Sequence, residues 1–582
     1  MLDDPRTKAR TFLESSSIVS ELEDVLNLLI DEKPDDLHGF LANHFLHQSK
    51  QPQIASLILK RLTGPAGEPA VHIDLTVALR NRSQRYNGLT VNLSSGKLNA
   101  QTMKDYETFV NSPSLATIFN RVDLFDHTTI DELLANFRSE HVHEVPKVPK
   151  VTAPLEPESS TSEIIAEVST LKLPATKQKP VVSPAVVVKT GGAPPPSQKR
   201  TTKEIQPIEV LPDEPEPSSF AGQLLITGIS LACRLITAEI QQSNLYRLIQ
   251  LPSVTNPAIP LPIIPILQSG PTYPGKQSIV KYYMLIPTPD VVHNEEWIFK
   301  LHSIIQNLRD SLTTAKGAIL QAGYSTDDGC LVYSMDKPEQ GLDILQNAVN
   351  TVCGTKEHWF DYGIQMGPYE AYDYTNGVYE TMAGVTKSPD ELADTYTEWI
   401  NAYPRCIMII DPFRHADKPA LSRLCHRVSN RCYVTSTDTR RYQYNDDNDT
   451  TNCHLINLDN APTVTELIQR VNTLRETHDY ALGLFERDHH EVAQVHLADL
   501  AVGFGCRFLK LPGLLSLGGQ TTSVILQRLS IIRDELQMND CEQSARPKQH
   551  EFIHIRSTFD IPDLEMPPTS TNTKNKDKKK RP

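Results

Sequence analysis

Short apolar runs alternate with amphipathic segments over residues 220–542, and this alternation restricts the possible folds more than any other feature of the chain. Segments such as PDELADTYTEWINAYP carry apolar residues at helical spacing and lie between several of the runs. Repeated strand-then-helix units favour an α/β barrel with its chemistry at the carboxyl ends of the strands, and a doubly wound sheet is the alternative. The candidate strands are YYMLIP, GCLVYS, FDYGIQM, CIMIIDPF, RCYVTS, CHLINL, YALGLF and CRFLKL.

Residues 51–142 have the pattern of a small α+β domain. Over residues 54–93 apolar positions alternate and are interrupted by the turn-forming stretch TGPAGEP, which is typical of an antiparallel hairpin. Residues 100–140 return to helical periodicity and end in TTIDELLANFRSE. We therefore expect a sheet followed by helices ahead of the barrel.

Two segments lack the composition of a folded domain. Residues 143–219 are rich in Pro, Lys, Glu, Ser and Thr and almost free of aromatic residues. Such a segment cannot bury enough apolar surface to offset the entropy lost on ordering. We expect a disordered insert there, and a C-terminal tail with a basic end over residues 543–582.

Residues 1–50 predict two short amphipathic helices separated by the break EKPDD. Helices of this length do not bury both apolar faces alone, so they usually pair with a second copy or with a partner helix. The stretch LLIDEKPDDLHGFLANHF resembles the dimerisation and docking hairpin of kinase regulatory subunits and ciliary scaffold proteins. The resemblance implies a homodimer and a docking partner, and a helical cap packed on the rest of the chain is the alternative.

Overall composition excludes several classes of function. The formal net charge is −14 and 39% of residues are hydrophobic, so there is no electrostatic reason to expect nucleic acid as a partner. No window has the 18 apolar residues of a membrane span, and the start MLDDPRTKAR lacks an apolar signal core. Nine cysteines without paired spacing fit a reducing compartment. We expect a cytoplasmic protein that does not enter the membrane.

Six segments in order resemble the enolase family. GEPAVHIDL is similar to the hairpin that opens the enolase N-terminal domain, and ITGISLACRLITAEIQQSNLYRLI to the first helix at the barrel. SPDELADTYTEWINAYPRCIMIIDPF matches the segment that ends in Glu-Asp-Pro-Phe, and APTVTEL, LADLAVGF and LSIIRDEL follow in order. The resemblance spans most of residues 54–540. With the N-terminal hairpin and the insert, it points to a divergent, sperm-type enolase-like branch.

The resemblance implies phosphopyruvate hydratase activity, the glycolytic conversion of 2-phosphoglycerate to phosphoenolpyruvate, with Mg²⁺ as cofactor. This reaction needs hard-cation ligands and a base. The family's three metal carboxylates correspond here to Gln365, Ile410 and Ser436, or Thr437 if the last register slips by one residue. No intact Mg²⁺ site can be assembled from these side chains.

The catalytic positions that the resemblance assigns are partly kept and partly replaced. Lys510 and Asp328 stand at retained positions, the latter as a shorter carboxylate, whereas Asn457 replaces the base lysine and Tyr282 replaces a glutamate. An amide cannot act as a base near neutral pH. Tyr273 stands at the lid histidine after Gly270 and Pro271, and a proline stiffens a loop that must move. The phosphate-binding run becomes Arg487, Asp488 and His489, and the small-domain serine position reads Leu98.

The most economical hypothesis is a degenerate enolase with a structural or docking role in a cilium or the sperm flagellum. An active Mg²⁺-dependent hydratase with a rearranged site is the alternative, and only that protein would bind 2-phosphoglycerate. Structural roles remain open for the retained residues, because Lys510 could pair with Asp328 or Asp411, and Asp-Asp-Gly is a common turn. Scattered cysteines and histidines match no zinc-finger spacing, so we expect core and surface roles for Cys425, His426, Cys432, Cys453, His454, His490 and His496.

Overall fold

The computed structural model describes most of the chain outside the expected insert and tail. The described residues are 5–63, 69–92, 110–112, 115, 117–141, 223–273, 275–314, 325–326, 328–435, 437, 451–457, 463–477, 481–485 and 495–539. The insert, the tail, the GPAGE turn, Leu98, Ser436, Arg487, Asp488, His489 and His490 lie outside them. One compact unit comprises Met1–His143 with Glu214–Pro582, and Glu144–Asp213 form a second that is not described. The other domain boundaries stay predictions.

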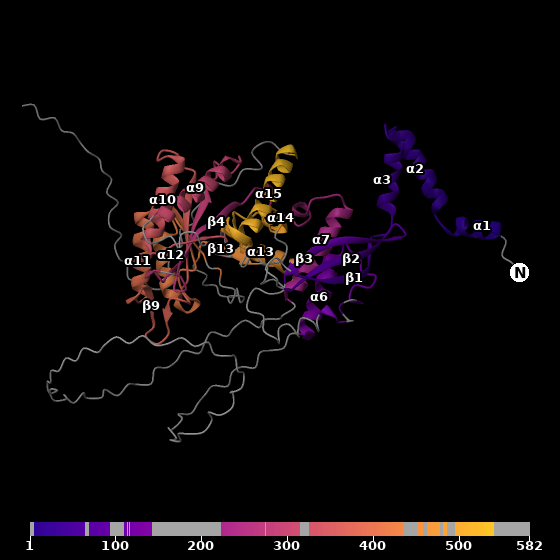
Figure 1. Ribbon diagram of the computed structural model, residues 1–582. Helices are drawn as coiled ribbons and strands as arrows, with labels where there is room; N and C mark the ends of the chain where they lie inside the picture. The colour runs from indigo at the N-terminus through magenta and orange to yellow at the C-terminus, as the bar shows by residue number, and fades with distance from the viewer. Residues whose placement is uncertain are drawn as a thin grey trace, which may run out of the picture. The chain divides into compact units, whose positions relative to one another are not determined.

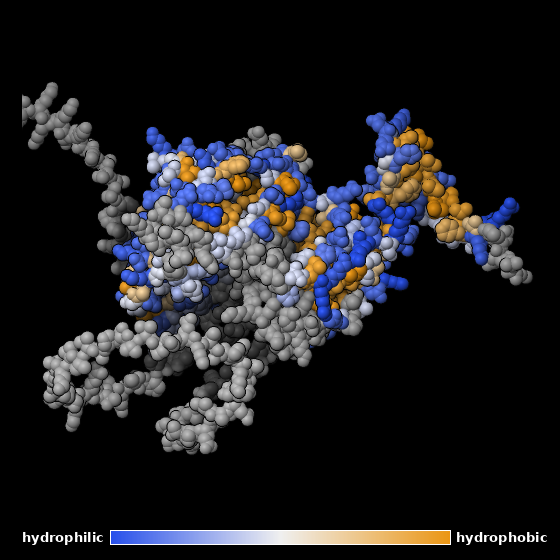
Figure 2. All heavy atoms as spheres, in the orientation of Figure 1, coloured by the Kyte–Doolittle hydropathy of each residue, from blue (hydrophilic) through white to orange (hydrophobic). Residues whose placement is uncertain are grey.

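Three helices open the chain: α1 (Pro5–Ser15), α2 (Ile18–Glu32) and α3 (Leu37–Gln48). The last two are the predicted pair. Lys33 ends α2 with a left-handed backbone, and the Asp36 side chain caps α3 by accepting a hydrogen bond from the Gly39 amide at 2.9 Å. Figure 2 shows hydrophobic residues gathered over these helices. These helices therefore present hydrophobic side chains to solvent.

A three-stranded antiparallel sheet follows, in the order β1 (Gln53–Thr63), β2 (Pro69–Leu79) and β3 (Arg82–Asn92). Helices α6 (His127–His141) and α7 (Gln223–Ile240) complete this region, and α7 contacts β2, β3 and α6 (Figure 1). Gly228 lets α7 approach the sheet, because a Cβ there would lie 2.4 Å from Val91 Cγ2. The predicted α+β pattern of sheet and helices is present.

The largest sheet is barrel-like and has nine strands. It runs in the order β12-β11-β7-β5-β4-β15-β14-β13, with β6 paired to β4. All described pairings are parallel except those of β5, which is antiparallel to both neighbours. The strands are β4 (Leu261–Gln268), β5 (Val280–Pro287), β6 (Leu331–Val332), β7 (Phe360–Met366), β11 (Cys406–Ile410), β12 (Tyr433–Thr435), β13 (Cys453–Asn457), β14 (Ala481–Phe485) and β15 (Phe508–Lys510).

The two end strands of this sheet, β12 and β13, lie next to each other. Asn452, just before β13, accepts a hydrogen bond from the Val434 amide at 2.7 Å and donates to the Cys432 carbonyl at 3.0 Å. One buried side chain therefore bridges the seam of the barrel. The α/β barrel prediction is confirmed, and the doubly wound alternative is wrong because its sheet would remain open.

Helices surround the barrel strands, as expected for strand-then-helix units (Figure 1). A small second sheet of β8 (Tyr372–Asp373), β9 (Val378–Met382) and β10 (Val385–Lys387) precedes α11, whose Ser388 forms a capping box with Glu391. The helices are α8 (Leu245–Leu248), α9 (Glu296–Thr314), α10 (Glu339–Cys353), α11 (Pro389–Ala402), α12 (Lys418–Val428), α13 (Val464–Thr477), α14 (His496–Gly503) and α15 (Ser516–Asn539), with a 3₁₀ turn at His415–Asp417.

The sequence pattern did not predict β4. Pro262 and Pro265 lie inside it, and proline normally argues against a central strand because it cannot donate to a ladder. Every residue of β4 is nevertheless buried, and the register shifts beside Pro265. Among the described residues, no helix is both long and apolar enough to cross a bilayer.

Candidate active site at the strand ends

Three residues that the enolase resemblance assigned come together at the carboxyl ends of the barrel strands. Lys510 is the last residue of β15, and Asp328 lies just ahead of β6. The side chain of Tyr282, on β5, connects them. Its ring centroid lies 5.5 Å from Lys510 Nζ, and its hydroxyl donates a hydrogen bond of 2.5 Å to Asp328 Oδ2. The retained lysine and the retained carboxylate therefore share a tyrosine that the family does not have.

Gln268, the last residue of β4, completes this network. Its amide nitrogen lies 3.3 Å from the Tyr282 hydroxyl and 3.5 Å from Asp328 Oδ2. Its carbonyl oxygen is buried without a hydrogen-bond partner among the described residues. Burial, and then the Asp328 carboxylate, raise the pKa of Tyr282, so the phenol stays protonated and donates to Asp328.

Lys510 is buried, with 8% of its surface exposed. Among the described residues its ammonium forms no hydrogen bond and no ion pair within 4.0 Å, so the expected pairing with Asp328 or Asp411 is absent. Burial lowers the pKa of Lys510, the Asp328 carboxylate opposes this, and the Lys281 ammonium lowers the pKa further. The lysine is thus closer to its neutral form than an exposed lysine is.

The strand ends that should carry metal ligands are joined by a hydrogen-bonded cluster, which we call the Asp411 clasp. It comprises Asp411, directly after β11, Gln365 on β7 and Thr437 after β12. The Gln365 amide donates to Asp411 Oδ2 at 3.0 Å, the Thr437 amide donates to Oδ1 at 2.6 Å, and the Thr437 hydroxyl also donates to Oδ2. Asp411 has a left-handed φ of 52°, a conformation that aspartate tolerates better than most residues.

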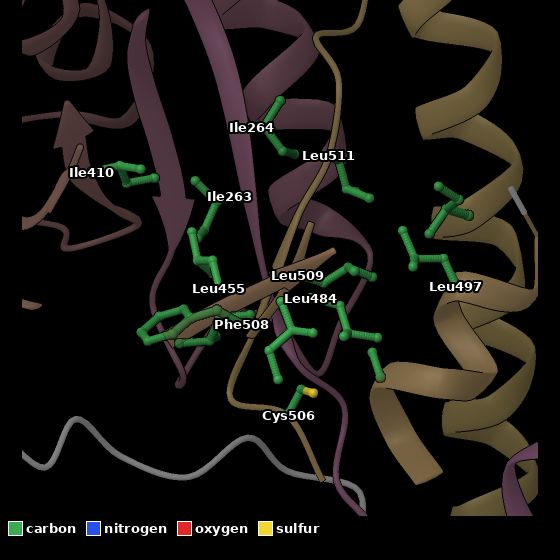
Figure 3. Packing of buried hydrophobic residues seen from close by; sticks show 14 of the residues in the cluster. Ile263, Ile264, Ile410, Leu455, Leu484, Leu497, Cys506, Phe508, Leu509 and Leu511 are labelled. Carbon is green, nitrogen blue, oxygen red and sulfur yellow. The ribbon is translucent and has the colours of Figure 1, made fainter. Parts of the chain in front are cut away.

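These residues do not fit a bound Mg²⁺. Ile410 is fully buried, and Figure 3 draws it with Ile263 and Leu455 in one hydrophobic cluster. Gln365 turns its amide donor toward Asp411, which is the orientation opposite to that of a metal ligand. In the part of the chain that the structure describes, no group of three His, Cys, Asp or Glu residues is arranged to hold a metal. The clasp joins strand ends to which the resemblance assigns metal ligands.

The loop that corresponds to the enolase lid is attached to its surroundings. The Lys276 and Gln277 amides both donate to the Met335 carbonyl, at 2.9 and 3.0 Å, and the Gln277 side chain bonds Ser269 and Val280. Gly275 has a φ of +126°, and a Cβ there would lie 2.5 Å from the Met335 carbonyl oxygen. Tyr273, at the lid histidine position, is half-buried. Backbone and side-chain bonds thus fix this loop near the barrel.

The other assigned positions are resolved unevenly. Asn457 ends β13 opposite Phe485 of β14, which places its backbone at the same edge of the barrel. Ser436, Arg487 and His489 lie outside the described residues, so the phosphate-binding and third metal positions stay predictions.

The cysteines and histidines do not form a zinc site among the described residues. Cys425, Cys432 and Cys453 are fully buried, and burial raises the pKa of Cys453 to about 12, which keeps the thiol protonated. His426 is exposed on α12. His496 begins α14 and is half-buried rather than on an open surface, and burial lowers its pKa.

One site residue, Gln268, was not predicted from the sequence, because it ends a strand whose two prolines argued against a strand. Thr437 was predicted only as a register alternative for a metal ligand. Asp411 was considered only as a partner for Lys510. A signal for the clasp exists in retrospect: IIDPF and VTST each end a barrel strand in polar residues, and adjacent parallel strands bring such ends together.

Comparisons with known proteins agree on one family. The family described as "Enolase, C-terminal TIM barrel domain" matches residues 256–519. A Xenopus laevis protein named Enolase 4 is 26% identical over 558 residues, 91% of each chain. The Homo sapiens Enolase 4 is 24% identical over 566 residues, 92% of this chain and 88% of its own. An Enolase of Mastigamoeba balamuthi is 23% identical over 322 residues, 53% of this chain and 71% of its own.

Proposed function

Because the chain belongs to the enolase family as a divergent member, we propose that it has kept the barrel as a scaffold and lost the family's Mg²⁺-dependent chemistry. The observation that carries the proposal is the Asp411 clasp. A bound Mg²⁺ needs oxygen atoms with free lone pairs at several strand ends. Here one strand end is aliphatic and the next supplies an amide donor.

The proton-transfer groups support the same proposal. Tyr282 stands where the resemblance places a carboxylate, and its hydroxyl is engaged with Asp328. Lys510 remains, but the second lysine of the family pair is replaced by Asn457. Loss of the base and of the metal ligands together removes both halves of the family mechanism, because the base takes the proton from carbon and the metal would stabilise the negative charge that then develops on oxygen.

A coupled assay tests this part of the proposal. The full chain at high concentration, with 2-phosphoglycerate and excess Mg²⁺, is expected to form no phosphoenolpyruvate above background. The control is Lys510→Met, which removes the retained lysine and nearly keeps its volume. Mg²⁺-dependent turnover that is present in the parent and lost in this variant would establish the alternative, an active hydratase with a rearranged site. Turnover that persists in the variant indicates a contaminating enolase and leaves the proposed inactivity standing.

The second part of the proposal is that helices α2 and α3 form a homodimer. Val19, Leu22, Leu26 and Ile30 follow one another at spacings of three or four residues, so they share one face of α2. Each is exposed, from 45% for Leu22 to 63% for Ile30. Two short helices with an exposed apolar face are stabilised in water when that face packs against a second copy of the chain.

A substitution on this stripe tests the dimer. Leu26→Glu places a charge in the centre of the stripe and is expected to convert the dimer to a monomer in analytical ultracentrifugation. Asn27→Glu, an exposed position next to it in the sequence and on another face of α2, is the matched control and is expected to remain dimeric. A parent chain that is monomeric at all concentrations would contradict this part of the proposal without affecting the first.

The proposed role is that of a docking or structural protein in the cytoplasm, in a cilium or flagellum. Its support is the resemblance of residues 1–50 to docking hairpins, together with the exposed face of α2. Deletion of residues 1–50 is expected to abolish enrichment of a tagged chain in axonemes. Unchanged enrichment after the deletion would refute a role for the hairpin in localisation.

A further inference from the structure

The surroundings of Lys510 are unusual for a lysine with a purely structural role. A buried lysine is normally held by a carboxylate or by hydrogen bonds, because an unpaired buried charge is costly. Lys510 is 8% exposed, and among the described residues its contact is with the ring of Tyr282, at 5.5 Å from Nζ. Within the described part of the chain, its amine therefore has no hydrogen bond that must break before it reacts.

A proton donor and its acceptor lie beside this amine. The Tyr282 hydroxyl and Asp328 Oδ2 are 2.5 Å apart. A phenol hydrogen-bonded to a carboxylate can supply a proton to a leaving oxygen and take it back. Lys510 is also at the carboxyl end of a barrel strand, where bound molecules gather in this kind of fold.

The Gln268 side chain in this network can accept a further hydrogen bond. The Gln268 side chain is 4% exposed, and its carbonyl oxygen lacks a partner among the described residues although its amide nitrogen is engaged. A donor on a bound molecule would satisfy such a buried acceptor. A neutral hydroxyl group is a suitable donor, because it makes the hydrogen bond without adding a charge to a buried site.

We propose that Lys510 reversibly captures small hydroxyaldehydes or hydroxyketones as an imine. The Lys510 nitrogen attacks the carbonyl carbon and forms a C–N bond. The carbonyl oxygen takes up the two amine protons, passed through the Tyr282–Asp328 pair, and leaves as water. The product is a C=N bond and one water molecule, with no oxidation or reduction. The ligand's hydroxyl donates to Gln268. Desolvated lysines are the usual imine-forming groups of proteins, because the neutral amine is the nucleophile.

Reductive trapping on the full chain tests the proposal. The protein is incubated with glycolaldehyde, which carries one carbonyl and one hydroxyl, in the presence of sodium cyanoborohydride, and the modified lysines are mapped by peptide mass spectrometry. The expected result is early, preferential modification of Lys510. Modification spread over exposed lysines, with none at Lys510, would overturn the proposal. This arm needs no variant, so it does not depend on whether a mutant folds.

Three variants test the separate roles of Lys510 and Tyr282 in the trapping reaction. Lys510→Arg is expected to lose the early adduct, whereas Lys281→Arg, at a 42% exposed lysine beside Tyr282, is expected to keep it. Tyr282→Phe keeps the ring and removes the hydroxyl. It is expected to slow trapping at Lys510 by on the order of a hundredfold, the lower range for a positioned proton-transfer group. Thermal melting of each variant establishes that it is folded. Trapping at an unchanged rate in a folded Tyr282→Phe variant would overturn the role of the pair.

Discussion

Removal of the Asp411 carboxylate is expected to destabilise the barrel strongly. In Asp411→Ala, the Thr437 amide, the Thr437 hydroxyl and the Gln365 amide all lose their acceptor. Each hydrogen bond to a charged group contributes about 1.5–3 kcal/mol, but bonds that share one acceptor are not additive, so we take about 3 kcal/mol for the set. Alanine in the left-handed conformation at φ 52° adds about 1 kcal/mol. The free energy of unfolding should fall by about 4 kcal/mol.

Urea denaturation followed by tryptophan fluorescence measures this loss, because Trp297, Trp359 and Trp399 all lie in the barrel half of the chain. A loss of this size corresponds to a decrease of roughly 10 °C in Tm. Asp411→Asn is the matched control: asparagine tolerates the left-handed backbone and keeps one accepting oxygen, so we expect a loss of only about 1 kcal/mol.

The double-mutant cycle of Asp411→Ala with Gln365→Leu should give a coupling energy of about 1 kcal/mol or more, as expected for side chains in contact. If Asp411→Ala lowers the free energy of unfolding by less than about 1 kcal/mol, the clasp does not hold the strand ends together and the reasoning fails.

Three further measurements probe buried charged and hydrophobic groups. Ile410→Glu restores the family's carboxylate but buries it among hydrophobic side chains, so it should lower the unfolding free energy by ~3 kcal/mol or more, and calorimetry should detect no Mg²⁺ binding. Arg234→Met removes the 2.8 Å ion pair between Arg234 and the buried Asp131. It should lower the free energy of unfolding by about 3–5 kcal/mol, as measured by a thermal melt. Burial holds the pKa of His127 at about 4, below its usual value of about 6.5, so stability is full above pH 6.5 and should fall by about 1.4 kcal/mol per unit as pH decreases toward 4. His127→Leu should remove that slope, and a variant of the exposed His302 should not.

The sequence predicts the barrel well where strands are short, apolar and β-branched. FDYGIQM and CIMIIDPF become β7 and β11 because a parallel strand covered on both faces reads as a continuous apolar run. The same rule does not identify LPIIPILQ as a strand, because two prolines argue against a central strand. The segment nevertheless forms β4. The rule also overestimates GCLVYS, of which only Leu331–Val332 pair as a strand.

For the candidate site, the sequence indicates which residues lie together but not how they are bonded. The resemblance assigns Lys510, Asp328 and Tyr282 to one site, and the structure places the three side chains at one edge of the barrel. It does not reveal that Tyr282 links the other two, or that Asp411 collects three donors. Such bonds depend on side-chain rotamers and on the left-handed backbone at Asp411, and neither can be recognised in a single sequence.

The bridge made by Asn452 across the seam between β12 and β13 has a mechanical consequence. Elsewhere around the barrel, neighbouring strands share a ladder of backbone bonds, so pulling them apart must break several bonds together. Among the described residues, β12 and β13 share no backbone ladder and are joined by side-chain bonds: the Asn452 amide bonds Val434 and Cys432, and the Cys453 thiol bonds Thr435. Under mechanical tension the barrel is therefore expected to open first along this line.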